Sequence, residues 1–300
     1  MIKNKIKIGT RGSKLALIQT NLVINALKQQ YTEIECEVVV IHTTGDKILD
    51  KPLIEFGGKA VFVSEFEEAL LKNDIDLAIH SAKDMPMKMK EGLDILGVLK
   101  REDPRDVLIT MRDNRVEEKS MAVIGTSSLR RQMQVEELYT NIECKPLRGN
   151  VNTRVNKLKD GMYDGIILAA AGINRLELNM ESDCEYKYFD IDELIPAGGQ
   201  GIIAIEGRKN SELSEVIGKI SDSAARLELE TERRILELFN AGCHEPIGAY
   251  SKVDGNEITI WMMKEVNGEI IKTKESTSVE KRLKLAEKMA NSILEEIPHE

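Results

Sequence analysis

The sequence has few residues that could build a disulfide framework or a metal site. Its 300 residues include only four cysteines and four histidines. The cysteines lie far apart and form no CxxC pair: Cys36, Cys144, Cys184 and Cys243. The histidines show no metal-ligand spacing: His42, His80, His244 and His299. Both patterns argue against disulfides and against a bound metal.

Long apolar runs and an excess of positive charge are also missing. No stretch approaches the ~20 apolar residues that a membrane span needs. Residues 1–8 alternate Lys or Asn with Ile and form no apolar signal-peptide core. The formal net charge is −9, with 42 basic and 51 acidic residues, which is unlike a nucleic-acid binder. We therefore expect a cytoplasmic protein that binds neither membrane nor nucleic acid.

An internal repeat predicts two related domains. Ile8-Gly9-Thr10 returns as Ile124-Gly125-Thr126, each time between an apolar strand and a helix. Tyr31–Cys36 returns as Tyr139–Cys144, with five of the six residues identical. The matching elements occur in matching order, so chance is a poor explanation. Strands that alternate with helices imply a largely parallel sheet in each domain.

Two helix starts are marked by capping residues. Ser13 precedes apolar residues at helical spacing and suits an N-cap, and the second copy of the repeat predicts a helix from about Ser128. Ser64 with Glu67 three residues later predicts a capping box.

The last third of the chain has a different pattern. A long helix, roughly Asp222 to Asn240, is followed by three strands and by an amphipathic helix from near Ser278. Val266-Asn267-Gly268 predicts a hairpin turn into the third of these strands. This order is typical of a small α+β domain. The glycine-rich stretch Pro196–Gly201 precedes another apolar strand, and we interpret it as a hinge by which the chain returns to the first domain.

Arginine gathers at loops and helix starts although the chain is acidic. The residues concerned are Arg11, Arg130, Arg131, Arg148, Arg154 and Arg175. A helix N-terminus next to Arg suits a carboxylate or a phosphate. The alternative is that these are ordinary surface arginines paired with Glu. The loops contain no Walker motif, so a polycarboxylate ligand is at least as good a prediction as a nucleotide.

Two further positions carry chemistry. Lys83 and Asp84 follow a buried strand, where ligand groups gather in open α/β sheets, although a surface ion pair would look the same. Cys243 lies in a loop before Pro246, so its thiol should be more accessible than the strand cysteines Cys36 and Cys144. Cys243 is therefore a candidate nucleophile.

A series of motifs occurs in order along the chain. They are Gly9–Ser13, Glu55–Lys59, His80–Pro86, Arg101–Asp106, Gly125–Gln132, Leu147–Arg154, Pro196–Gly201 and Gly242–Gly248. With these motifs the chain resembles the porphobilinogen deaminase, or hydroxymethylbilane synthase, family from Gly9 to about Tyr250. The last 50 residues match in layout only.

The resemblance implies an α/β fold with two related periplasmic-binding-protein-like (type II) α/β domains and a small C-terminal α+β domain. The expected boundaries are 1–99 with 199–219 for the first domain, 104–193 for the second and 221–300 for the third. The third domain would carry the cofactor cysteine.

The resemblance also implies a transferase of porphyrin, tetrapyrrole and heme biosynthesis. It would join four porphobilinogen molecules head to tail, with loss of ammonia and a final hydrolysis, into hydroxymethylbilane. One dipyrromethane primer per chain would be attached to Cys243 by a thioether. The expected partners are porphobilinogen and its oligomers, and the enzyme would be a monomer that hands its product to the next enzyme of the pathway.

Residue roles follow from the matched positions. Asp84 matches the catalytic aspartate of the family. The positions that hold the primer match Ser81, Lys83, Asp84, Thr126, Ser128, Arg130 and Arg131. The positions that line the substrate and growing chain match Arg11, Ser13, Gln19, Phe62, Arg148, Arg154, Arg175 and Gln200. Each pyrrole ring brings two carboxylates, which explains the arginines, while Asp84 would stabilise the cation left when ammonia departs.

Departures from the family pattern are small: Ala241 before Gly242, His244 after the cysteine, and Ile202 after Gly201. Two other interpretations remain open. One is a binding protein for a carboxylate ligand, which would need neither Cys243 nor Asp84. The other is a sugar- or nucleotide-phosphate enzyme, but the chain lacks the acidic clusters that hold Mg²⁺.

Overall fold

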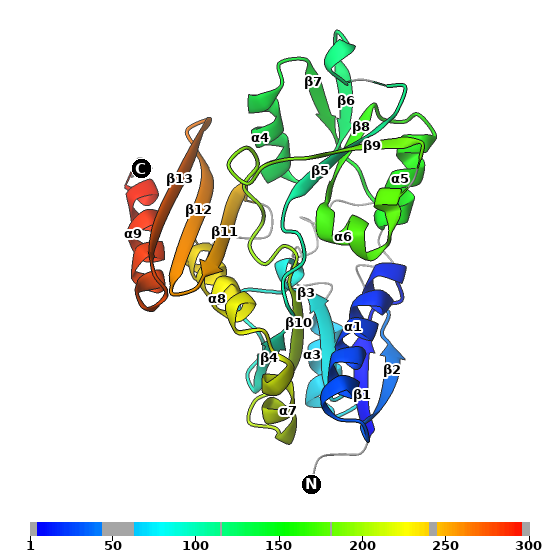
Figure 1. The fold of residues 1–300 in the computed structure, drawn as a ribbon, viewed down its shortest axis with the longest axis vertical. Helices are drawn as coiled ribbons and strands as arrows, with labels where there is room; N and C mark the ends of the chain where they lie inside the picture. Colours follow the sequence, from blue (N-terminus) through cyan, green and yellow to red (C-terminus); the bar gives the residue numbers. More distant parts are fainter. Residues whose placement is uncertain (1–4, 44–62, 115, 181, 240–244, 296–300) are drawn as a thin grey trace. The chain divides into compact units, whose positions relative to one another are not determined.

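The computed structural model describes residues 5–43, 63–114, 116–180, 182–239 and 245–295. The chain divides into two compact units, Met1–Glu102 with Ile202–Leu229 and Asp103–Gly201 with Glu230–Glu300. Figure 1 labels their helices and strands. The first unit contains one α/β domain. The second contains the other α/β domain together with most of the C-terminal segment.

The first unit is built on a mixed five-stranded sheet in the order β2-β1-β3-β10-β4. Its strands are β1 (Lys5–Thr10), β2 (Glu35–Val40), β3 (Leu77–Ser81), β4 (Leu93–Val98) and β10 (Ile203–Arg208). Its helices are α1 (Lys14–Gln30), α3 (Ser64–Leu71), α7 (Glu212–Ile220) and the 3₁₀ turn η3 (Ala82–Asp84). Apolar residues of α1 and α7 pack on one face of the sheet, and those of α3 pack on the other.

The second unit contains a sheet in the order β7-β6-β8-β5-β9. Its strands are β5 (Asp106–Met111), β6 (Ala122–Gly125), β7 (Ile142–Lys145), β8 (Gly165–Ala169) and β9 (Cys184–Tyr188). Its helices are α4 (Leu129–Leu138), α5 (Val151–Lys159) and α6 (Ala170–Arg175), with the 3₁₀ turns η4 (Val116–Glu118) and η5 (Leu178–Met180). Consecutive strand residues face opposite sides, so Leu108 packs with α4 and Val107 with α5.

The two sheets share one strand order, which confirms the predicted pair of related α/β domains. β1, β2 and β3 correspond to β6, β7 and β8, and each set is parallel. The fourth strand, β10 in the first sheet and β5 in the second, is antiparallel to both of its neighbours. The expectation of a largely parallel sheet therefore missed one strand in each domain, because apolar periodicity carries no information on strand direction.

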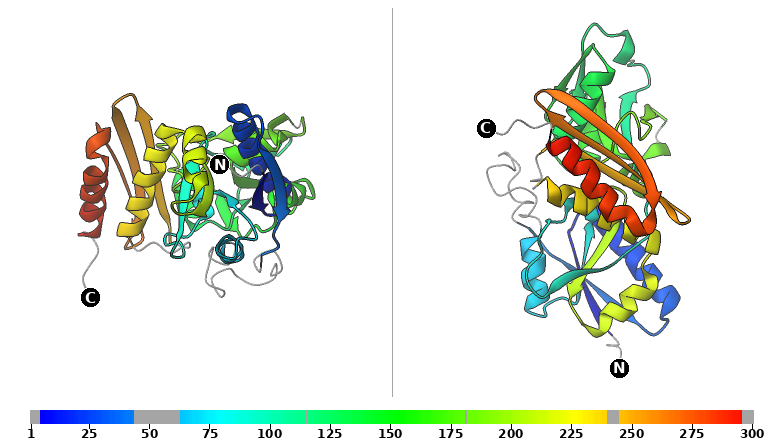
Figure 2. Two further views of the ribbon diagram at one scale, coloured as in Figure 1. Left: turned by 90° about the horizontal axis from the view of Figure 1, so that it is seen from below. Right: turned by 90° about the vertical axis from the view of Figure 1, so that its left-hand side faces the viewer.

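The C-terminal segment forms the predicted α+β arrangement. It consists of α8 (Ser223–Leu238), β11 (Ile247–Asp254), β12 (Glu257–Val266), β13 (Glu269–Ser278), η6 (Val279–Lys281) and α9 (Arg282–Leu294). Figure 2 shows α9 lying along the three-stranded sheet, and its apolar residues share a core with β11 and β12. Asn267 and Gly268, both at positive φ, make the expected tight turn between β12 and β13.

One of the two predicted helix caps is confirmed. Ser13 accepts a hydrogen bond from the Ala16 N–H at the start of α1, and Ser128 caps α4 in the same way. The capping box at Ser64 is wrong. Ser64 is the first residue of α3, and Glu67 turns into the protein, where its Oε1 accepts from the Lys90 N–H at 3.0 Å.

Candidate active site

In the first unit, the predicted site residues follow the carboxyl ends of parallel strands. Arg11 and Ser13 come after β1, whereas Lys83 and Asp84 lie in the η3 turn after β3. Because β1 and β3 are parallel, these ends share one edge of the sheet. The start of β10 reaches the same edge, where the Ala82 N–H donates to the Ile202 carbonyl at 3.0 Å. The strand topology therefore brings the segments of Arg11, Ser13, Lys83 and Asp84 to the same end of the first sheet.

One contact joins two predicted residues of the first unit directly. The amide Nε2 of Gln19, on α1, donates to Ser81 Oγ at 2.9 Å. Gln19 is buried, whereas the side chains of Ser81, Lys83 and Asp84 are half-buried. The Gln19 contact therefore fixes the Ser81 hydroxyl at the point where the chain turns towards Asp84.

A buried acid–base pair supports the strand that leads to Asp84. His80 Nε2 lies 3.0 Å from Glu206 Oε2 on β10, and its ring meets the Phe66 ring edge to face. Glu206 is fully buried, and its Oε1 has no hydrogen-bond partner in the described part of the chain. Burial also raises the pKa of Glu67, a carboxyl group close enough for its charge to interact with that of Glu206. The pair ties β3 to β10, and this suits a structural histidine.

In the second unit, side-chain hydrogen bonds order the starts of α4 and α5, at the carboxyl ends of β6 and β7. Thr126 Oγ1 accepts from the Ser128 N–H at 3.2 Å, directly before α4. At the start of α5, Arg154 Nε donates to the Gly149 carbonyl at 2.7 Å, and Gly149 has φ +112°. A left-handed conformation of this kind favours glycine. The turn therefore holds Arg154 next to the helix start.

Arg130 and Arg131 both bind the carboxylate of Asp106, a residue for which the sequence predicted no role. Asp106 Oδ1 accepts from Arg131 Nε at 3.0 Å and from Arg131 Nη2 at 2.7 Å. Its Oδ2 accepts from Arg130 Nη2 at 2.7 Å. Burial opposes ionisation of Asp106, but the two guanidiniums outweigh it and hold the pKa of this carboxyl far below its usual range. The available signal was the place of Asp106 at the end of the Arg101–Asp106 motif and at the start of an apolar strand.

Gln200 and Arg175 contact the glycine-rich stretch of the second unit. Gln200 Nε2 donates to Asp106 Oδ1 at 2.9 Å and to the Pro104 carbonyl at 2.8 Å. Arg175 Nη2 donates to the Gly201 carbonyl at 2.7 Å. The unit boundary falls after Gly201, beyond the stretch that we interpreted as a hinge. That interpretation stays a prediction.

Some predicted residues lie outside the described part of the chain. They are Phe62, Ala241, His244, the motif Glu55–Lys59 and the cofactor cysteine Cys243. Of the other cysteines, Cys184 is buried, and burial raises the pKa of Cys36 and raises that of Cys144 to about 12. Such thiols are poor nucleophiles. Within the described ranges, no cluster of His, Cys, Asp or Glu suits a metal ion, and no helix is long and apolar enough to span a membrane.

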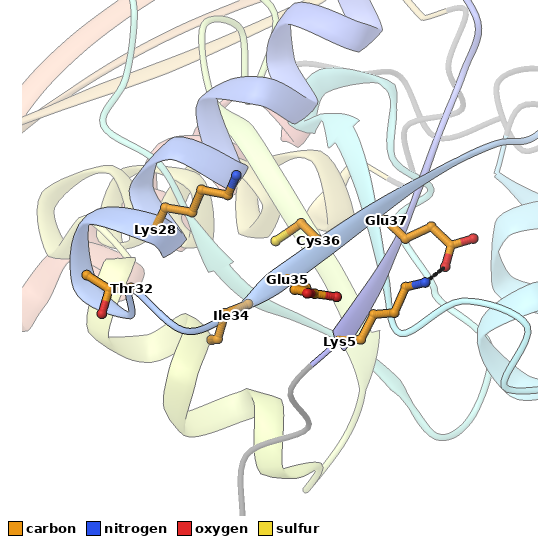
Figure 3. A pocket seen from close by; sticks show the side chains of 7 residues that line it. All are labelled: Lys5, Lys28, Thr32, Ile34, Glu35, Cys36 and Glu37. Atoms are coloured by element: carbon orange, nitrogen blue, oxygen red, sulfur yellow. Dashed lines mark ion pairs between the residues drawn. The ribbon is translucent and has the colours of Figure 1, made fainter.

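A surface hollow of about 670 Å³ lies at the opposite edge of the first sheet. It is lined by Lys5, Lys28, Thr32, Ile34, Glu35, Cys36 and Glu37. Figure 3 shows Lys5 and Glu37 pointing towards one another, with 2.9 Å between Lys5 Nζ and Glu37 Oε2. The hollow lies at the amino ends of β1 and β2 and contains none of the predicted site residues.

The chain is similar to known proteins of one family along nearly its whole length. Residues 6–215 match the family model "porphobilinogen deaminase, dipyromethane cofactor binding domain", and residues 226–298 match the C-terminal domain of the same family. The porphobilinogen deaminase of Clostridium novyi is 42% identical over 298 residues, covering 98% of this chain and 99% of that protein. That of Alkaliphilus metalliredigens is 47% identical over 255 residues, covering 84% and 80%.

Among solved structures, the periplasmic VFT2 domain of Bordetella pertussis BvgS aligns with a TM-score of 0.44 at 13% identity, covering 72% of this chain and 86% of that chain. The family matches, in contrast, extend over nearly the whole sequence. The chain therefore belongs to the porphobilinogen deaminase family, and it is a tetrapyrrole-building transferase with a dipyrromethane cofactor-binding domain.

Proposed function

We propose that this chain joins four porphobilinogen molecules head to tail and releases hydroxymethylbilane by hydrolysis, with Asp84 as the catalytic carboxylate and Cys243 as the attachment point. The observation that supports this assignment is the buried pair Arg130 and Arg131, which share the single carboxylate of Asp106. Two guanidinium charges against one carboxylate leave a net positive charge, which favours an anionic ligand.

The residues fit a dipyrromethane group. Such a group carries carboxylates, and when bound it supplies the pyrrole end to which the first substrate is joined. Arg130 and Arg131 would bind its carboxylates, helped by Thr126 and Ser128 at the start of α4, where free backbone N–H groups also favour an anion. Lys83 and Ser81, which match the other primer-holding positions of the family, are proposed for the same role.

Asp84 would act on the substrate. When ammonia leaves porphobilinogen, positive charge develops on the pyrrole, and a carboxylate held in place stabilises it without reorganising solvent. The same carboxylate can accept the proton lost when the new bond forms. The predicted lining of the growing chain would pair with the substrate carboxylates: Arg11, Ser13, Gln19, Phe62, Arg148, Arg154, Arg175 and Gln200.

The cellular setting is also proposed. An acidic chain without a membrane-spanning helix in its described part supports a cytoplasmic enzyme. We expect a monomer that passes its product to the next enzyme of tetrapyrrole synthesis. The domain limits 1–99 with 199–219, 104–193 and 221–300 belong to the same proposal.

Intact mass tests the attachment. Purified protein should carry the added mass of two pyrrole units, and Cys243→Ser should lack both this mass and turnover. Cys36→Ser and Cys184→Ser are matched controls that should keep both. A Cys243→Ser variant that still carried the added mass would place the attachment elsewhere.

Turnover tests Asp84. Asp84→Asn keeps the size of the side chain and removes its charge, so kcat should fall by ~10²–10³. Asp84→Glu keeps the charge and should retain more activity than Asn. The reverse order would mean that shape matters and charge does not, and the cation-stabilising role would have to be abandoned.

A further inference from the structure

Asp106 is the residue through which three predicted ligand-binding side chains contact one another. It is the first residue of β5, and it is fully buried. Its two oxygens accept four hydrogen bonds of 3.0 Å or less, from Arg130, Arg131 and Gln200. We propose that Asp106 is a positioning residue, which orients both guanidiniums so that they can receive the carboxylates of the primer. The proposal rests on the proposed function.

The two arginines are held to different degrees. Arg131 uses all three of its nitrogens, with Nε and Nη2 on Asp106 Oδ1 and Nη1 on the Ile167 carbonyl at 3.0 Å. Arg130 uses two, with Nη2 on Asp106 Oδ2 and Nη1 on the Ile195 carbonyl at 2.6 Å. A guanidinium has five N–H groups, so two remain on Arg131 and three on Arg130. Both therefore keep donors for a ligand while their planes are fixed.

The charge of the cluster also points to a ligand. Both arginine side chains are buried, and the described residues supply no second carboxylate to either of them. A buried net charge is costly unless a partner neutralises it. One further carboxylate would balance the cluster, and Asp106 decides where that carboxylate can lie because it fixes the donors that remain.

Substitution of Asp106 should disturb the orientation of the two guanidiniums as well as the stability of the fold. In Asp106→Asn, an NH₂ group would face N–H donors of Arg130, Arg131 or Gln200, so at least one contact becomes donor against donor. In Asp106→Glu, the charge stays but the carboxylate moves by ~1.5 Å. Sites of this kind lose function when the supporting contacts shift by about that much.

The test uses full-length protein and a matched control in the same domain. Asp164 also accepts several hydrogen bonds, from Lys119, Asn114 and the Val123 N–H, and none of these is a predicted site residue. The fraction of protein that carries two added pyrrole units is measured by intact mass, alongside the melting temperature. We expect Asp164→Asn to lose stability and keep its primer. Asp106→Asn should also lose stability, because it removes the partner of two buried guanidiniums. Unlike Asp164→Asn, the folded Asp106→Asn protein should in addition lose the primed fraction by about tenfold or more.

Asp106→Glu separates positioning from stability, because it keeps the charge balance. We expect it to melt near the wild type with a primed fraction still reduced. Wild-type priming in either Asp106 variant would overturn the proposal. Failure of both variants to fold, while Asp164→Asn folds, would show a purely structural role and would also overturn it. Absence of added mass from the wild type would instead overturn the proposed function.

Discussion

Removal of the carboxylate of Glu232 should destabilise the second unit more than any surface charge does. Glu232 lies on α8 and is fully buried. Its Oε2 accepts from the Gly199 N–H at 2.7 Å. Its Oε1 accepts from the N–H and Oγ of Ser251 on β11, at 2.7 Å and 3.2 Å. One side chain therefore joins a helix, the glycine-rich stretch and the C-terminal sheet.

The size of the effect follows from these contacts. A hydrogen bond to a charged group contributes ~1.5–3 kcal/mol, and a buried donor that loses its partner is costly. Glu232→Ala leaves two backbone N–H groups without an acceptor and adds a cavity, so we expect a loss of about 3–5 kcal/mol. Glu232→Gln keeps one oxygen and places an NH₂ group against the other donor, so its loss should be about 1.5–3 kcal/mol.

The single tryptophan provides the assay. Trp261 lies on β12 in the same unit, and its Nε1 donates to Asp192 Oδ1 at 2.7 Å. Its fluorescence during urea denaturation should report the loss, and each kcal/mol should lower the melting temperature by ~2–4 °C. Glu237→Ala, on the exposed side of α8, is the control and should cost no more than ~1 kcal/mol. Equal free energies of unfolding for Glu232→Ala and Glu237→Ala would refute the reasoning.

Three other outcomes are expected. The fold lowers the pKa values of Asp106 and Asp164, so the ionised carboxylates stabilise the folded protein above 3.8, their pKa in the unfolded chain. This contribution should be lost as the pH falls below that value. A urea midpoint that stayed constant from about pH 7 to pH 3 would contradict this. Arg175→Leu should leave primed protein that stalls, with bound chains that differ by one pyrrole in intact mass; a wild-type mass profile would remove its elongation role. Cys36 and Cys144 should react slowly with iodoacetamide at neutral pH, because burial raises their pKa values; alkylation as fast as in unfolded protein would count against their burial.

Much of the fold was predictable because it depends on near neighbours. The cap at Ser13 bonds to a residue only three positions away, and the turn at Asn267 and Gly268 needs a backbone that those residues adopt readily. The failure at Ser64 is instructive. The Ser-x-x-Glu pattern was present, but the N–H of Lys90, distant in sequence, bonds to Glu67 instead.

The candidate site was predictable in its residue types but not in its internal contacts. The motifs predicted that Thr126, Arg130 and Arg131 follow the end of a strand. In the structure they follow β6, which is parallel to β8. Nothing in the local sequence indicated that both arginines would turn to Asp106. Arginine side chains are long and flexible, so their partners are decided by whatever carboxylate the fold brings within reach.

The sequence by itself determined the repeat, the helix starts, the α+β end and the family, because periodicity, capping and motif spacing are properties of short segments. Only the tertiary structure decided that β5 and β10 each run antiparallel to their neighbours in their own sheets. It also decided that Glu232 joins three segments, and that Gln200 contacts Asp106 from 94 residues away in the sequence. The physical reason is that a buried polar group must find a partner somewhere in the folded chain. Chain topology brings that partner near, and neighbouring residues in the sequence do not specify it.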